Sequence, residues 1–259
     1  MKRLRFILKY FSHLFDAKNT KGHGIHSPYL YRFTQNAIYE KNPFYVFPKI
    51  EILRENLNFD DRILHIRDYG TGSDREARVF EIAKTSLKRP KWAQLLYRVV
   101  HFTKAQHVLE LGTSLGLTTA YMAAVNSEIR CVSLEGSEEI AKIARENFEK
   151  LELDNIELVV GNIDETLELQ LTKSDKLDVV FFDANHRKEP VMKYFLQCLE
   201  HIHPDSVFIF DDIHWSAEME QTWRQIRKNS RVTTTIDLFE VGIVFFNKNY
   251  PKKTYKMKL

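Results

Sequence analysis

The sequence predicts an α/β fold, in which a mainly parallel seven-stranded sheet ends in an antiparallel hairpin and follows an N-terminal helical extension. From about residue 105 onward, short apolar runs alternate with helical stretches. These runs are apolar on both faces, as a parallel sheet covered by helices requires. The last two strand-like segments lie close together, with Gly242 near their turn. A chain of 259 residues with 44% hydrophobic content can bury such a core.

The predicted elements follow one another along the chain. The five apolar strands cover residues 107–111, 129–135, 156–160, 177–183 and 206–212. The helices cover residues 118–125, 138–151, 164–171, 191–201 and 217–227. The segments that form the hairpin are 232–239 and 241–246. We expect Trp223, on the apolar face of the last helix, to be a core residue. Trp215 precedes that helix and is a candidate lining of an acceptor pocket.

Three regions are expected. Residues 1–104 form an N-terminal helical extension or lid, residues 105–250 the α/β domain, and residues 251–259 a basic tail. In the extension, loops are predicted at residues 22–28, 42–48 and 68–73. Ser27 and Pro28 are typical of a helix start, with Ser as the cap. They do not account for the nearby His23 and His26, which belong either to a lid over an acceptor or to simple helix packing.

Bulk charge and cysteine content indicate which classes of partner and site the sequence favours. The formal net charge of +3 gives no indication of nucleic acid as a partner. Cys131 and Cys198 each lie in an apolar segment with no second cysteine nearby. This pattern is typical of reduced core residues rather than of a disulfide or a zinc site, and it favours the cytoplasm.

Residues 1–15 predict an amphipathic basic helix. Its apolar residues recur at helical spacing, with basic residues elsewhere on the helix. Such a helix packs on its own domain or on a second subunit, as in a homodimer, or makes peripheral contact with an anionic membrane. Lys9 and His13 interrupt the apolar run, which is therefore too short for a signal core or a membrane span.

The segment VLELGTSLGLT, residues 108–118, predicts a ligand-binding turn at the end of the first strand. Gly112 and Gly116 allow a tight turn, and Thr113 and Ser114 add hydroxyl groups. The turn lacks both the G-x-G-x-x-G spacing of dinucleotide folds and a P-loop lysine, so a diphosphate is not the expected ligand. Glu135 ends the second strand and can accept two hydrogen bonds from a ribose diol.

These strand ends resemble the successive cofactor motifs of the class I S-adenosylmethionine-dependent methyltransferases. The resemblance includes VVGNIDETL after the third strand and extends over about residues 105–247. It implies that Glu110 and Gly112 face the methionine part of the cofactor, with the Thr118 hydroxyl near its carboxylate. The full cofactor-binding set that it implies is Glu110, Gly112, Thr113, Ser114, Gly116, Thr118, Glu135 at the ribose, Gly136, Asn162 and Ile163 at the adenine edge, and Asp183.

Three acids follow the next two strands. Asp183 is separated by 211 − 183 = 28 residues from Asp211 and its neighbour Asp212. This distance equals one crossover between strands, so we expect the three carboxylates to converge. Oxygen-rich clusters of this kind suit Mg²⁺ or Ca²⁺. Alternatively, the acids cap the following turn and helix, and His186 and His214 are exposed loop residues.

The acidic cluster resembles that of the catechol O-methyltransferase group, in which an Asp and an Asp-Asn pair hold Mg²⁺. Here Asp212 replaces the Asn, which leaves the need for a metal open. His186 occupies the position of that group's catalytic lysine. The resemblance therefore implies Asp183 and His186 as catalytic residues and Asp183, Asp211 and Asp212 as metal ligands, with imidazole suited to act as a general base. The alternatives for His186 are that it binds a metal or recognises the substrate.

The function expected from these observations is methyl transfer from S-adenosylmethionine to an oxygen of a small molecule, with a divalent metal as a further candidate cofactor. Two alternatives stay open. One is a catalytically silent S-adenosylmethionine-binding module that acts through protein or membrane contacts. The other is a methyltransferase whose acceptor is RNA or protein; a continuous basic stripe at the sheet edge would favour RNA.

Overall fold

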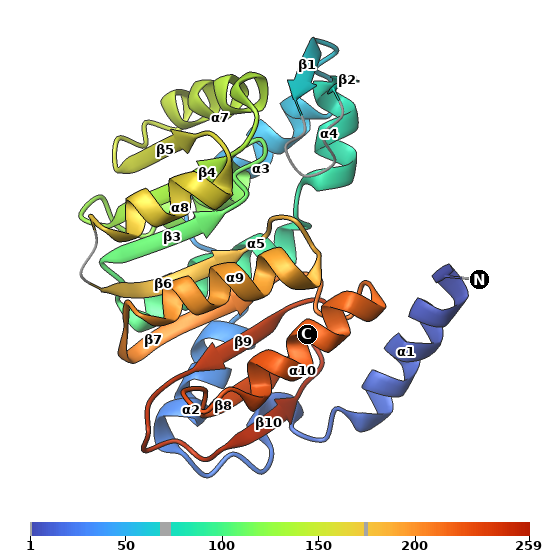
Figure 1. Ribbon diagram of the computed structural model, residues 1–259, viewed down its shortest axis with the longest axis vertical. Helices are drawn as coiled ribbons and strands as arrows, with labels where there is room; N and C mark the ends of the chain where they lie inside the picture. Colours follow the sequence, from blue (N-terminus) through green and yellow to red (C-terminus); the bar gives the residue numbers. More distant parts are fainter. Residues whose placement is uncertain (1, 68–73, 174–175) are drawn as a thin grey trace. The chain divides into compact units, whose positions relative to one another are not determined.

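The computed structural model describes residues 2–67, 74–173 and 176–259, and its helices and strands form two compact units (Figure 1). The first unit combines residues 1–40 with residues 174–259, and the second comprises residues 41–173. The loop predicted at residues 68–73 lies outside the described residues. Each unit contains both helices and strands, as the predicted fold class requires.

The second unit contains the predicted βαβαβ segment, whose strands β3, β4 and β5 lie side by side in parallel (Figure 1). These strands are His107–Leu111, Arg130–Glu135 and Ile156–Val160. The helices that alternate with them are α6 (Leu117–Ala123), α7 (Glu138–Lys150) and α8 (Ile163–Leu171). Ser137 caps α7 by accepting a hydrogen bond from the Ile140 backbone N–H, which explains where that helix begins.

The part of the second unit before β3 is not purely helical. Helices α3 (Phe47–Leu57), α4 (Val79–Ser86) and α5 (Pro90–Thr103) appear there, as expected. Between α3 and α4, however, the antiparallel strands β1 (Ile63–Arg67) and β2 (Asp74–Arg78) pair, so the prediction of a purely helical extension is wrong here. Buried side chains of α3, α4, α5, α6 and α7 share one hydrophobic core with residues of β1 and β2.

The first unit contains a mixed sheet of five strands among its described residues. They are β6 (Leu177–Phe182), β7 (Ile202–Phe210), β8 (Thr234–Asp237), β9 (Gly242–Phe245) and β10 (Lys253–Lys256). Strand β7 pairs in parallel with β6 and antiparallel with β9. The predicted hairpin is present as β8 and β9. In the predicted basic tail, β10 adds a parallel strand beside β8.

Helices α9 (Lys188–Leu199) and α10 (Ala217–Lys228) follow β6 and β7, as predicted. Trp223 of α10 is buried, which confirms its predicted place in the core. Gly242 makes room for it, because a Cβ at residue 242 would lie 2.7 Å from the Trp223 ring. Cys131 and Cys198 are buried free thiols, also as predicted.

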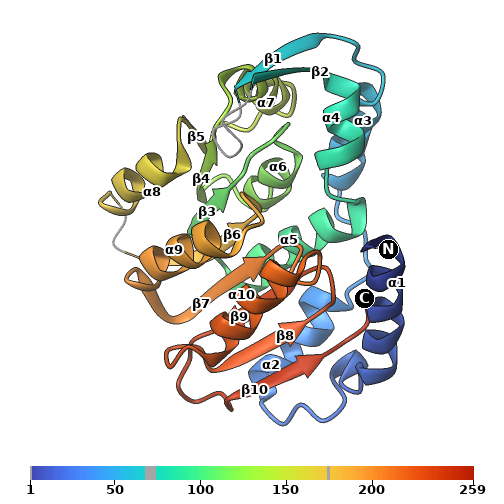
Figure 2. The same cartoon turned by 45° about the vertical axis from the view of Figure 1, so that its right-hand side comes forward.

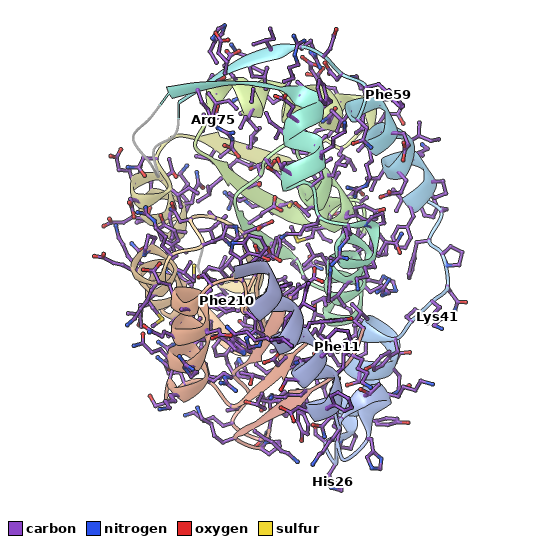
Figure 3. All side chains as sticks on the ribbon, turned by 90° about the vertical axis from the view of Figure 1, so that its right-hand side faces the viewer. Phe11, His26, Lys41, Phe59, Arg75 and Phe210 are labelled. Carbon is purple, nitrogen blue, oxygen red and sulfur yellow. The ribbon has the colours of Figure 1, made fainter. Side chains whose placement is uncertain are left out.

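The N-terminal residues of the first unit form α1 (Lys2–Asp16), a short 3-10 turn (Thr20–Gly22), α2 (Pro28–Phe33) and a π turn (Thr34–Ile38). Figure 2 shows α1 beside the C-terminal end of the chain, where the backbone N–H of Asn19 donates to the Lys256 carbonyl at 3.1 Å. The Ser27 hydroxyl caps α2, as predicted. His23 and His26 are exposed, and Figure 3 shows His26 in the loop before α2.

One face of α1 is apolar and exposed. Leu8, Phe11 and Phe15 are 62%, 53% and 83% exposed, and Figure 3 shows Phe11 on the outside of the helix. Contact of this face with a second subunit or with a membrane surface stays a prediction. Among the described residues, no helix has both the length and the apolar composition needed to cross a membrane.

Candidate cofactor site and acidic cluster

The turn between β3 and α6 has the backbone geometry expected of the glycine motif. Gly112 and Gly116 have φ angles of 101° and 83°, and Ser114 between them has a φ of 50°. A Cβ on Gly116 would lie 2.6 Å from the Phe148 ring, so no other residue fits there without rearrangement. The backbone N–H groups of Gly112 and Thr113 donate to the Leu134 carbonyl of β4, which ties the turn to the neighbouring strand.

Glu110 lies at the centre of a buried ring of hydroxyl groups. It is 0% exposed, and its carboxylate accepts hydrogen bonds from Thr118 and Ser133, each at 2.6 Å, and from Thr119. Burial raises the pKa of Glu110 to about 7, although the three hydroxyl bonds act in the opposite direction. In this arrangement Glu110 and Thr118 bond to each other and hold β3, α6 and β4 together. Their predicted contacts with the methionine part of a cofactor stay predictions.

Glu135, at the end of β4, also braces the turn. One carboxylate oxygen accepts from the Ser114 backbone N–H at 2.8 Å, and the other from the Ser137 N–H at 2.9 Å. Burial raises the pKa of Glu135, and backbone N–H groups including that of Gly136 partly offset this effect. A carboxylate oxygen accepts more than one hydrogen bond, so Glu135 keeps capacity for a ribose diol.

The Ser114 side chain marks a polar position within this turn. Its hydroxyl oxygen is buried and has no hydrogen-bond partner among the described residues. A buried polar atom of this kind is unfavourable unless something else satisfies it, so Ser114 is a candidate contact for a polar ligand. Thr113, in contrast, bonds to Ser133 at 2.5 Å and belongs to the hydroxyl ring beneath the turn.

The end of β5 joins the same region through backbone contacts. The Gly161 N–H donates to the Glu135 carbonyl at 2.9 Å. Asn162 caps α8, because its side-chain oxygen accepts from the Asp164 N–H at 3.1 Å. Ile163 is largely buried. Helix capping therefore accounts for Asn162 locally, and the adenine contacts of Asn162 and Ile163 stay predictions.

In the first unit, two of the predicted acids meet at one edge of the sheet. Phe182 of β6 lies opposite Phe210 of β7, so Asp183 and Asp211, the next residues, leave the two strands side by side. The side chain of His186 joins them, with its Nε2 3.5 Å from the Asp183 Oδ1. One ligand atom from each of these three lies within 4.8 Å of the others, which is a spacing suited to a shared cation.

Asp212 does not belong to this group of three among the described residues. It directly follows Asp211 and has a φ of 53°, so the chain turns at this residue instead of continuing the strand direction. His186 takes the third position because Asn185 and His186 both have positive φ angles, which fold the chain back toward Asp183. The predicted metal role of Asp212 stays a prediction.

His13, His214 and Asp237 form a second group in the same unit, which no sequence pattern predicts. No motif connects these residues, and 237 − 13 = 224 positions separate the outer two. Trp215 lies beside this group, 64% exposed, and its ring is 5.8 Å from that of Phe6 on α1. The predicted role of Trp215 in lining an acceptor pocket stays a prediction.

Comparison with known proteins identifies the same part of the chain. Residues 109–213 match the family model Methyltransf_24, a methyltransferase domain. The O-methyltransferase imqG of Aspergillus flavus is 30% identical over 122 residues, which are 45% of this chain and 49% of that protein. The catechol O-methyltransferase of Niastella koreensis is 28% identical over 127 residues, which are 48% and 57% of the two chains. The chain spans about half the length of these curated relatives.

Similarity to solved structures extends further along the chain. The O-methyltransferase of Bacillus cereus, solved in complex with SAH, aligns with a TM-score of 0.56 and 20% sequence identity. The alignment covers 83% of this chain and 96% of that one, and at this identity it shows the fold. Residues 109–213 therefore match a methyltransferase domain, and the chain shares the Rossmann-like α/β fold of that Bacillus cereus O-methyltransferase.

Proposed function

We propose that this protein transfers the methyl group of S-adenosylmethionine to an oxygen atom of a small molecule. The observation that carries the proposal is the turn after β3, where Glu135 and the buried Ser114 hydroxyl supply polar contacts at the end of parallel strands. Ligands bind at such strand ends in open α/β sheets. The relatives named above are O-methyltransferases, which supports an oxygen acceptor.

The reaction needs alignment and one proton transfer. As the acceptor oxygen bonds to the methyl carbon, the carbon–sulfur bond breaks and its electron pair stays on sulfur. The acceptor hydroxyl must also lose its proton, and we assign that proton to His186 Nε2. Asp183, 3.5 Å away, stabilises the imidazolium that forms.

A divalent cation suits the same cluster. Asp183 and Asp211 offer carboxylate oxygens, the ligands that Mg²⁺ prefers, and the imidazole of His186 lies within 4.8 Å of them. When bound, such a cation lowers the pKa of a hydroxyl that it contacts. Asp183 and Asp211 would hold the cation, which leaves His186 to accept the proton.

Calorimetric titration with S-adenosylmethionine tests the cofactor assignment. We expect the wild type to bind and Glu135→Ala to bind roughly 10–100-fold more weakly, because hydrogen bonds to a charged group contribute about 1.5–3 kcal/mol. Glu149→Ala, an exposed change on α7, serves as the matched control. Thermal denaturation without ligand separates a loosened turn from a lost ligand contact. If the wild type does not bind, the proposal is wrong.

An acceptor panel of catechols and simple phenols tests the chemistry, with EDTA and with added Mg²⁺. We expect transfer to catechols that Mg²⁺ stimulates and that Asp211→Asn and His186→Gln reduce. Activity that is insensitive to EDTA and to Asp211→Asn would rule out the metal-assisted version. Binding of S-adenosylmethionine without transfer to any acceptor would favour the silent binding module. The presence of Asp183, His186 and Asp211 in one group instead favours an enzyme.

A further inference from the structure

A second histidine and carboxylate cluster lies within the first unit. His13 comes from α1, His214 from the loop between β7 and α10, and Asp237 from the end of β8. One ligand atom from each lies within 4.8 Å of the others. The side chains of His13 and Asp237 are 6% and 1% exposed and that of His214 is 21% exposed, so the cluster is largely buried. The residues of the proposed methyl transfer do not include any of these three.

If the imidazole of His13 is neutral, one of its ring nitrogens faces a carboxylate oxygen with no hydrogen atom between them. Its Nε2 lies 3.0 Å from the Met257 carbonyl oxygen, which can only accept, so Nε2 carries a proton. The other nitrogen, Nδ1, lies 3.5 Å from the Asp237 Oδ1. In a neutral imidazole that nitrogen is an acceptor, and it would face a second acceptor. A positive charge, either a proton or a metal ion, is therefore required between them.

Both ring nitrogens of His214 also face carboxylate oxygens. Its Nε2 lies 3.0 Å from the Asp237 Oδ2, and its Nδ1 lies 3.5 Å from the Glu220 Oε1. A neutral imidazole has one N–H, so it can donate to only one of these two carboxylates. If Nδ1 donates to Glu220, the Nε2 lone pair points toward Asp237. Histidines that bind metals show this pattern, in which one nitrogen faces the ion and the other donates to a carboxylate or carbonyl.

The carboxylate of Asp237 is held in place by two hydrogen-bond donors. The Trp223 Nε1 donates to it at 3.2 Å and the Phe239 backbone N–H at 3.0 Å. Asp237 is thus a potential ligand in a buried site that two imidazoles face.

The distances between ligand atoms fit a small tetrahedral ion. Zinc binds imidazole nitrogen and carboxylate oxygen at about 2.0–2.2 Å, which places tetrahedral ligands roughly 3.3 Å apart. His13 Nδ1 lies 3.5 Å and His214 Nε2 3.3 Å from the same oxygen, Oδ1, of Asp237. We propose that His13, His214 and Asp237 bind one divalent cation of the zinc class, which fastens α1 to β8 and to the loop that carries His214.

The site would also fix the surroundings of Trp215. The Phe239 ring packs against the cluster, 5.4 Å from His13 and 5.3 Å from His214, and Phe6 of α1 lies 5.0 Å from Phe239. Phe6 also contacts Trp215. A cation at the cluster would hold α1, and with it the Phe6 contact, in one position.

Metal analysis of the full chain, purified without a histidine tag, tests the proposal. After incubation with Zn²⁺ and removal of the excess by gel filtration, we expect one Zn²⁺ per chain by mass spectrometry. We expect His13→Gln and His214→Gln to lose it. His203→Gln is the matched control, because His203 pairs with Asp178 at 2.7 Å and is outside both groups of potential metal ligands. His186→Gln also retains the ion if the site is the one proposed.

Two further measurements do not depend on the variants folding normally. Co²⁺ added to the wild type should give visible absorption bands typical of four-coordinate Co²⁺ with nitrogen and oxygen ligands. Zn²⁺ should raise the Tm of EDTA-treated wild type. A wild type that retains no Zn²⁺ and gains no Tm would overturn the proposal, and so would Zn²⁺ that His186→Gln removes and His13→Gln does not. Neither result depends on the methyl-transfer proposal.

Discussion

Replacing Glu110 by glutamine should remove a pH-dependent loss of stability. The pKa of Glu110 rises from 4.5 to about 7 in the folded chain because the side chain is completely buried. Folding therefore favours the protonated form. The stability from this group is fully present below pH 4.5 and is lost as the pH rises through about 7. A difference of about 2.5 pKa units corresponds to about 3 kcal/mol at 1.36 kcal/mol per unit.

Urea denaturation at several values between pH 5 and pH 8 measures this effect. We expect the free energy of unfolding of Glu110→Gln, relative to the wild type, to increase by roughly 2–3 kcal/mol across that range. Other ionisable groups titrate in both proteins, so their contributions cancel in the difference. Glu149→Gln, which changes an exposed carboxylate, should show no such trend. If the difference in free energy of unfolding stays constant from pH 5 to pH 8, the pKa of Glu110 is not raised by burial as described.

Three further predictions follow from single contacts. Gly116→Ala should lower the free energy of unfolding by about 2–4 kcal/mol in urea, because the residue has a φ of 83° and its Cβ would meet Phe148 at 2.6 Å; a loss below about 1 kcal/mol would contradict the described turn. Asn147→Ala should cost about 1–3 kcal/mol in the same assay, because the buried Asn147 amide donates to the Leu115 carbonyl at 2.9 Å; an unchanged denaturation midpoint would contradict it. Asp211→Asn should reduce methyl transfer to a catechol at least tenfold and leave the residual rate insensitive to EDTA in a steady-state assay.

The parts of the fold that the sequence predicted are those with strong local patterns. Apolar runs bounded by polar strand ends gave the central strands, and the glycine spacing gave the turn at Gly112 and Gly116. The parallel pairing of β6 and β7 confirmed that Asp183 and Asp211 leave neighbouring strands. All of these inferences use residues that are close in sequence or separated by one crossover.

The missed features depend on weak patterns or distant contacts. Strand β2 reads DREAR and β10 reads KTYK, and such polar segments lack the apolar alternation that marks a strand. The group of His13, His214 and Asp237 forms only when α1 packs against β8. Likewise, the sequence alone does not show that Asp211 joins the group and Asp212 does not. The positive φ of Asp212 redirects the chain, and aspartate is compatible with many backbone conformations.

The pairing of β10 with β8 has a consequence for the order in which the chain folds. The second unit is one continuous stretch, residues 41–173, whereas the first unit is built from both ends of the sequence. During synthesis, the second unit can begin to fold while residues 1–40 still lack most of their partners. The packing partner of helix α1 is synthesised late, because His13 bonds to the Met257 carbonyl, 244 residues further on. We therefore expect α1 to stay exposed on the nascent chain until β10 has left the ribosome.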